Sequence, residues 1–100
     1  ATEMERYIYL RAREENGEIS DLLTQVRYEL IPKTKGERAI TYKVDFQYTL
    51  DGRTVVEDVK GYATRDYILR RKIFKWRYPE IKFLEVKNIG RKKYIIWEEK

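Results

Sequence analysis

Two aspartates and a lysine lie on an expected strand pair, where their side chains could bind a cation. Residues 40–50 alternate apolar and polar side chains up to Asp51-Gly52, which favours a strand that enters a tight hairpin turn. A turn centred on these two residues places Asp45 opposite Asp58, with their Cβ atoms roughly 5 Å apart. Facing carboxylates repel each other, and a divalent cation would offset the repulsion. Lys60 shares the face of Asp58, whereas a three-residue turn would shift the pairing by one residue and remove the facing aspartates.

The composition narrows the chemistry that such a site could perform. The chain has 100 residues, 42% apolar and 39% charged, which predicts one globular domain spanning residues 1–100. It contains no cysteine and no histidine, which excludes thiol nucleophiles, Ser-His catalysis and histidine zinc sites. The absence of cysteine suits a cytoplasmic location. The net charge of +5 favours a nucleic acid or another anionic partner, and no apolar run is long enough to predict a membrane span.

The remaining elements are expected to position this strand pair. A first helix is predicted from a Thr2–Glu5 capping box to about Glu15, burying a stripe of Met4, Tyr7, Ile8 and Ala12. Thr64 is predicted to cap a second helix over 65–77. Further strands are expected at 26–30, 81–86 and 94–97. The order is helix, three antiparallel strands, helix and strand, which predicts an α+β fold with one mixed sheet flanked by two helices.

Several residues together resemble the motif of a known superfamily. The pattern "VDF…VVEDVKG", between a helix that bears Glu3 and a basic helix, resembles the PD-(D/E)XK nucleases, which implies an αβββαβ core like that of restriction endonucleases. More narrowly, nearly the whole chain is similar to a small phage family of predicted nucleases of this type. The matching positions are Glu3, Tyr7, Gly17-Glu18-Ile19, Gln25, Tyr28, Asp45-Phe46-Gln47-Tyr48, 56–61 and Thr64. The proline that usually precedes the first aspartate is replaced by Val44.

The resemblance implies a metal-dependent phosphodiesterase site. Asp45 and Asp58 would bind Mg²⁺ or Mn²⁺, and the Val59 carbonyl would be a third ligand. Lys60 would orient water and stabilise developing negative charge. Glu3 would complete the site or bind a second ion, and Gln25 would orient it.

Each of these assignments has an alternative without catalytic function. Asp45 and Asp58 could be solvated partners of nearby lysines, and Lys60 could be a simple ion-pair partner. Glu3 could be a first-turn residue favoured by the helix dipole. Glu57 is the other residue that could be the second carboxylate of the motif, but it is expected on the opposite face of the strand from Asp58.

The second helix is rich in basic side chains and could follow a phosphate backbone. Arg65, Arg71, Lys72 and Lys75 are the candidate DNA contacts, together with the basic stretch 90–93. The alternative is a solvated helix face over a core stripe of Leu69, Ile73 and Trp76. The aromatic residues are expected to lie in the core and not to stack on bases.

The sequence therefore predicts a Mg²⁺- or Mn²⁺-dependent DNA endonuclease that acts in the cytoplasm of a phage-infected bacterium. Branched recombination intermediates are one substrate class that the resemblance suggests, because Holliday-junction resolvases of this superfamily are similarly small. Cutting such DNA symmetrically would favour a homodimer. Two alternative functions stay open. The chain could be a non-catalytic nucleic-acid-binding domain with the same fold, or it could be a structural or interaction module that does not bind DNA.

Overall fold

The chain folds into one mixed sheet with a helix on each face. The computed structural model describes residues 2–60, 64–90 and 93–98, and the side chains of residues 3–60 and 64–87. The elements are α1 (Thr2–Glu15), β1 (Ser20–Ile31), β2 (Ile40–Leu50), β3 (Arg53–Lys60), α2 (Arg65–Arg77), β4 (Lys82–Gly90) and β5 (Lys93–Glu98). This order confirms the predicted α+β class, although β1 and β4 are longer than the strands expected at 26–30 and 81–86.

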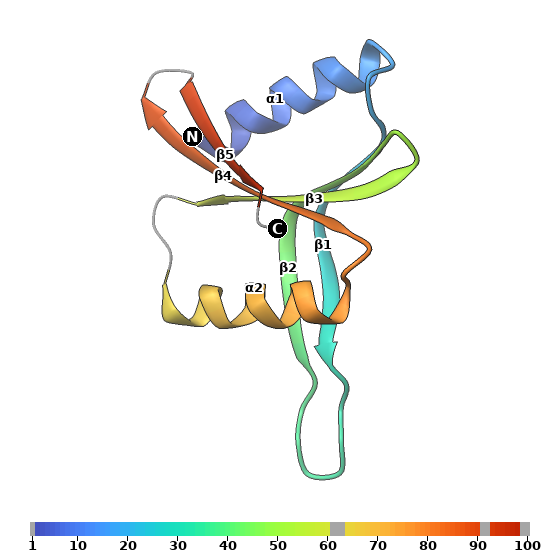
Figure 1. Cartoon of the computed structure of the whole chain (residues 1–100), viewed down its shortest axis with the longest axis vertical. Helices are drawn as coiled ribbons and strands as arrows, with labels where there is room; N and C mark the ends of the chain where they lie inside the picture. The colour runs from blue at the N-terminus through green and yellow to red at the C-terminus, as the bar shows by residue number, and fades with distance from the viewer. Residues whose placement is uncertain (1, 61–63, 91–92, 99–100) are drawn as a thin grey trace.

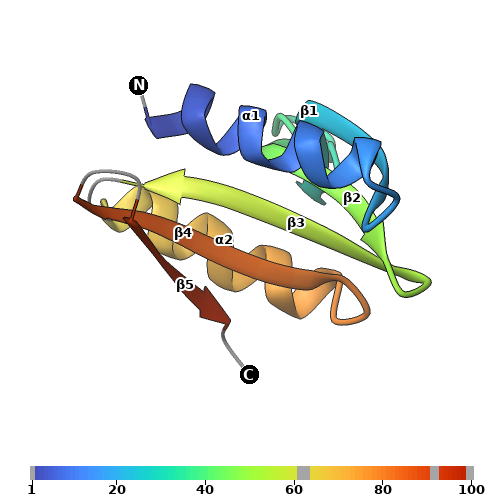
Figure 2. The same ribbon diagram turned by 90° about the horizontal axis from the view of Figure 1, so that it is seen from above.

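The five strands lie in the order in which they occur along the chain, β1 to β5. All neighbours are antiparallel except β3 and β4, which run parallel because α2 carries the chain back across the sheet. Figure 2 shows α1 on one face of the sheet and α2 on the other. The predicted mixed sheet with a central Asp51-Gly52 hairpin is confirmed, and both turn residues have positive φ, 51° and 77°.

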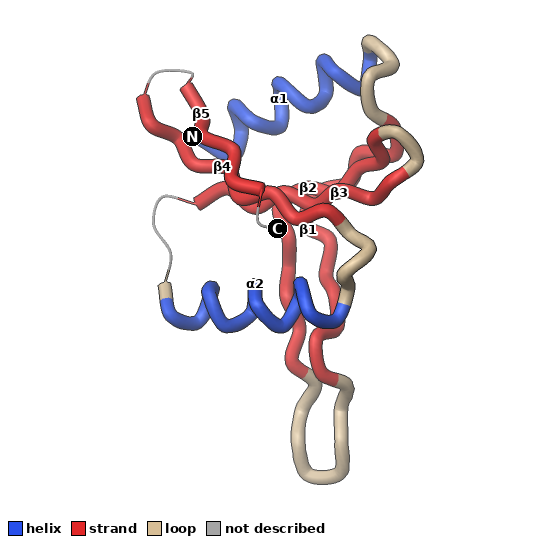
Figure 3. Tube along the Cα trace, in the orientation of Figure 1, coloured by secondary structure: helices blue, strands red, loops and turns tan. Residues whose placement is uncertain are grey.

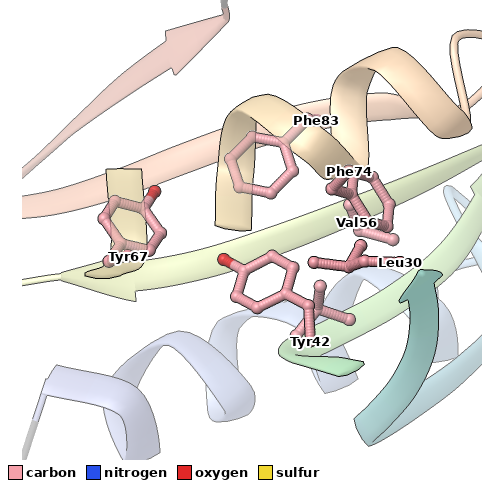
Figure 4. Close-up of a cluster of buried hydrophobic side chains, with 7 residues drawn as sticks. Leu30, Tyr42, Val56, Tyr67, Phe74 and Phe83 are labelled. Carbon is pink, nitrogen blue, oxygen red and sulfur yellow. The ribbon is translucent and has the colours of Figure 1, made fainter. Parts of the chain in front are cut away.

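The two faces of the sheet carry separate hydrophobic cores. The core under α2 contains Leu30, Tyr42, Val44, Val56, Tyr67, Phe74 and Phe83, most of them visible in Figure 4. The core under α1 contains Leu10, Ile19, Phe46, Tyr48, Val55 and Leu84. Both cores are closed by aromatic rings, such as Phe74 edge-on to Tyr28 at 5.0 Å between centroids.

The β1–β2 ribbon turns over in its middle, at Gln25 and Asp45. On β2, Tyr42 and Val44 belong to the α2 core, but Phe46 and Tyr48 belong to the α1 core. Their alternation alone would have placed all four on one face. Gln25 has a left-handed φ of 55°, and the ladder registers Thr24 with Phe46 and Val26 with Val44 on either side of this point. The turn-over therefore places Gln25 and Asp45 between the two cores.

The buried faces of both helices differ from the predicted stripes. On α1, Arg6 and Leu10 are buried, while Met4 and Ile8 are 59% and 61% exposed. The predicted stripe is therefore wrong at Met4 and Ile8, but Tyr7 does pack against the α1 core. Arg6 is buried because Glu57 lies beneath it on β3 and compensates its charge. The predicted capping box stays a prediction, because the side chain of Thr2 lies outside the described residues.

On α2, the predicted bounds and the Thr64 cap are confirmed, since the Thr64 hydroxyl accepts from the Tyr67 amide. The predicted core stripe is wrong at Leu69 and Trp76, which are exposed, but Ile73 does pack against the core. The buried residues of the helix are Tyr67 and Phe74.

The far ends of β1 and β2 extend beyond both helices as a long hairpin (Figure 3). The loop between them is closed by a Thr34–Glu37 bridge, and the molecule is 46 Å along its longest axis. No helix among the described residues is long and apolar enough to cross a membrane.

Candidate active site

The candidate site forms where β2 and β3 separate. Their ladder runs from Leu50–Arg53 to Phe46–Glu57, which confirms the predicted register over five pairs. At the next position the ladder gives way to a side-chain contact, in which Asp45 Oδ2 accepts a hydrogen bond from the Val59 amide at 2.8 Å. The predicted Asp45–Asp58 pair is therefore not part of the ladder, although Asp45 lies close enough to Asp58 to affect its pKa.

Asp58 is the buried carboxylate of this opening. It is 1% exposed and accepts a hydrogen bond from the Tyr42 hydroxyl. Lys60 Nζ lies 3.3 Å from the same oxygen, Oδ2, on the same face of β3, as predicted. The other oxygen, Oδ1, is buried and has no hydrogen-bond partner among the described residues. Burial of a carboxylate oxygen without a partner is costly, and coordination of a cation by Oδ1 would offset that cost.

The environment of Asp58 opposes its ionisation. Burial raises its pKa to about 7 from an ordinary 3.8. The nearby Asp45 carboxylate raises this pKa as well, while the Tyr42 hydroxyl and Lys60 partly offset the rise. A divalent cation between the two aspartates would remove this penalty, because it would neutralise both carboxylates.

Glu3 lies on the other side of Asp45. Its pKa is raised, first by modest burial and then by the Asp45 carboxylate. Its Oε2 accepts a hydrogen bond from the Gln25 amide at 2.9 Å. The structure thus brings Glu3 near Asp45, Asp45 near Asp58 and Lys60 near Asp58, and it places Gln25 beside Glu3. A groove of about 270 Å³ next to them is lined by Glu3, Met4, Tyr7, Thr24, Gln25 and Phe46.

The Val59 carbonyl faces the same opening. In a strand, the N–H and C=O of one residue point toward the same neighbouring strand. Because the Val59 amide donates to Asp45, its carbonyl points toward β2 as well. It is therefore placed to act as the predicted third oxygen ligand.

The residues fit a hard divalent cation, and each carboxylate also has a protein donor. Within the described part of the chain, no three acidic side chains are gathered as a ready metal site. Each carboxylate instead accepts a hydrogen bond from a protein donor: Glu3 from Gln25, Asp45 from the Val59 amide and Asp58 from Tyr42. Carboxylate and carbonyl oxygens are the ligands that Mg²⁺ and Mn²⁺ prefer.

Tyr67 and Glu85 support the site from α2 and β4, and sequence reasoning missed both. Lys60 Nζ lies 4.7 Å from the centroid of the Tyr67 ring, a cation–π distance. The Tyr67 hydroxyl donates to Glu85 at 2.7 Å, and Arg71 pairs with the same carboxylate at 3.3 Å. Burial raises the pKa of Tyr67, so its hydroxyl stays a donor. Lys60 is therefore held between Asp58 and an aromatic face.

Glu57 has a structural role on the opposite face. Arg6 donates to both of its oxygens, at 2.7 and 2.9 Å, and the Tyr48 hydroxyl donates to it as well. Glu57 is fully buried. The prediction that Glu57 points away from Asp58 is confirmed, but no sequence pattern indicated that Arg6 would be its partner.

The predicted DNA contacts divide into two groups. Arg65 and Lys72 are exposed, and Lys75 is half-buried. Arg71 faces inward, toward Glu85 and the ring of Tyr67. The side chains of the basic stretch 90–93 lie outside the described residues.

Comparison with known proteins places the chain in one family. Residues 1–94 match the family described as "Protein of unknown function (DUF1064)", and the chain belongs to that family. No curated protein and no solved structure matches the sequence significantly.

Proposed function

We propose that this DUF1064 protein is a metal-dependent DNA endonuclease of the PD-(D/E)XK type. The observation that carries the proposal is the buried Asp58 carboxylate, which has one oxygen without a partner among the described residues and lies beside Asp45 and Lys60. The element order and the parallel β3–β4 pair fit the core of that superfamily, and Lys60 follows Asp58 at the spacing of its motif.

Asp45, Asp58 and the Val59 carbonyl would hold Mg²⁺ or Mn²⁺, with Glu3 as a further carboxylate. When bound, the cation would polarise the scissile phosphate and lower the pKa of water. Of the proposed carboxylates, Glu3 lines the 270 Å³ groove.

Lys60 supplies the positive charge that the protein itself brings to the reaction. Its ammonium group is partly exposed and is restrained by Asp58 on one side and Tyr67 on the other. It can therefore hydrogen-bond a phosphate oxygen or orient water while it stabilises negative charge in the transition state. Gln25 restrains Glu3 and so limits where the third carboxylate can move.

Cleavage of labelled DNA tests this proposal. Linear duplex, single-stranded and four-way DNA would be incubated with Mg²⁺, Mn²⁺ or EDTA, using wild type, Asp58→Asn and Lys60→Met. We expect metal-dependent cutting that falls by about 10²-fold or more in both variants.

Asp66→Asn is the matched control, because Asp66 is an exposed carboxylate on α2 that pairs with Arg70. It should cut like wild type. Cutting that persists in Asp58→Asn, or that proceeds in EDTA, would contradict the proposed site. DNA binding by a folded wild type that never cuts would favour a binding module instead.

A further inference from the structure

The outer face of α2 carries a stripe of alternating basic and apolar side chains. Arg65, Leu69, Lys72 and Trp76 follow each other at spacings of four, three and four residues, which places them on one face of a helix. All four are exposed, Leu69 at 58% and Trp76 at 79%. Single exposed apolar residues are ordinary, but here two of them alternate with cations along one line of the surface. We call these four residues the α2 stripe.

The net charge of the chain resides on this helix. α2 contains six basic residues and one acidic residue, which gives it a charge of +5, while the other 87 residues carry sixteen of each sign. Asp66 is already paired with Arg70. Within the described residues, neither Arg65 nor Lys72 forms an ion pair. The charge of the helix therefore favours an anionic partner for the α2 stripe.

Trp76 adds a second requirement to that partner. Its indole ring is nearly fully exposed and offers a flat face that the core does not use. Backbone phosphates of an intact duplex would satisfy Arg65 and Lys72 but would leave no base face for the indole. A second copy packed face to face would bring the cations of both stripes together, which is unfavourable. Unpaired bases satisfy both needs, because they stack on aromatic rings while basic residues hold their phosphates.

The α2 stripe begins on the helical turn that contacts Lys60 of the candidate active site. Arg65 begins α2 five residues after Lys60, and Tyr67 beneath it contacts Lys60. From Arg65 to Trp76 the stripe is about 16 Å long, at about 1.5 Å per helical residue. Figure 1 shows α2 crossing the sheet from the side where β3 ends. A DNA strand that leaves the candidate active site could therefore follow α2.

We propose that the α2 stripe binds unpaired DNA, with Trp76 stacked on a base and Arg65 and Lys72 on phosphates. This inference rests on the proposed DNA substrate and narrows it to DNA with a single-stranded or unpaired segment. Trp76, which is 79% exposed, is an exception to the expectation that the aromatic residues lie in the core.

Binding measured by fluorescence anisotropy in EDTA tests the stripe without cleavage. The probes are a labelled thymidine oligonucleotide and a blunt duplex. Trp76→Ala should weaken oligonucleotide binding by about 5- to 150-fold, the range measured for loss of one stacked base. It should leave duplex binding unchanged. Ile8→Ala is the matched control, because Ile8 is a comparably exposed apolar residue on α1, and it should change neither affinity.

Lys72→Gln separates phosphate contact from stacking. Loss of one phosphate contact should reduce the salt dependence of oligonucleotide binding, with the logarithmic slope falling by about 0.7. Circular dichroism would check that each variant is folded. An unchanged slope would remove Lys72 from the binding surface.

Three results would overturn the proposal. The first is that Trp76→Ala binds the oligonucleotide as tightly as wild type does. The second is that wild type does not bind the oligonucleotide. The third is a wild-type dimer that Trp76→Ala converts to monomer in sedimentation, because the stripe would then join two copies. The cleavage assays are independent of these binding measurements. A protein that does not cut DNA but binds the oligonucleotide through Trp76 would refute the proposed nuclease activity and support the proposed role of the α2 stripe.

Discussion

Asp58→Asn should stabilise the metal-free protein at alkaline pH, although it removes the central residue of the proposed site. The substitution keeps the shape of the side chain and an acceptor for the Tyr42 hydroxyl, but it removes a charge that is buried in the fold. The pKa of Asp58 rises from 3.8 to about 7 on folding, so the folded state binds the proton more tightly than the unfolded state. Stability from this group is therefore complete below about pH 4 and is lost as the pH rises to about 7.

The size of this stability loss follows from the pKa shift of Asp58. At about 1.4 kcal/mol for each pKa unit, the rise corresponds to about 4 kcal/mol by pH 8. In EDTA, the difference in unfolding free energy between Asp58→Asn and wild type should grow by about that amount between pH 4 and pH 8. Urea unfolding followed by circular dichroism measures it.

Metal should narrow the stability difference between the two proteins at pH 8. A cation at a hundred times its dissociation constant stabilises the protein that binds it by about 2.7 kcal/mol. We expect this gain at pH 8 in wild type and little of it in Asp58→Asn. Parallel pH profiles of the two proteins in EDTA would refute the reasoning, as would equal stabilisation of both by Mn²⁺. Asp66→Asn, with an exposed charge, should follow wild type in every condition.

Three further predictions concern the residues around the site. Arg6→Met should destabilise the fold by about 3–5 kcal/mol in urea unfolding, because it leaves Glu57 buried without a compensating charge; the added substitution Glu57→Leu should recover much of the loss. Gln25→Gly should be about 1 kcal/mol more stable in urea unfolding than Gln25→Ala, because φ is 55° at this position and glycine adopts a positive φ without strain. Both variants should cut DNA more slowly than wild type, because Glu3 loses its hydrogen-bond donor. Tyr42→Phe should move the acidic limb of the cleavage pH profile to higher pH, because the Tyr42 hydroxyl lowers the pKa of Asp58; an unmoved limb would exclude Asp58 as the titrating group.

Local chemistry made part of the site predictable. The Asp51-Gly52 turn fixes the register of β2 and β3, because a two-residue turn allows only one pairing. Strand parity then places Lys60 beside Asp58 and Glu57 on the other face. These relations extend over a few residues, so they could be read from the sequence.

The helix faces were not predictable in this way. Met4, Ile8, Leu69 and Trp76 have apolar side chains, yet all four are exposed. A helical pattern shows which residues share a face, but it does not show which face meets the sheet. Arg6 is buried only because Glu57 is opposite, and that pairing joins residues 51 positions apart.

By itself, the sequence determined the order of the elements, the hairpin register and the carboxylate–lysine motif, because turns, caps and parity act between near neighbours. Only the tertiary structure decided that Tyr42 and Tyr67 border the site and that the β1–β2 ribbon turns over at Gln25 and Asp45. It also decided that Asp58 is buried, with one oxygen unpaired among the described residues. Burial and charge compensation depend on which distant segments pack together, and one helix face or strand does not encode that choice alone.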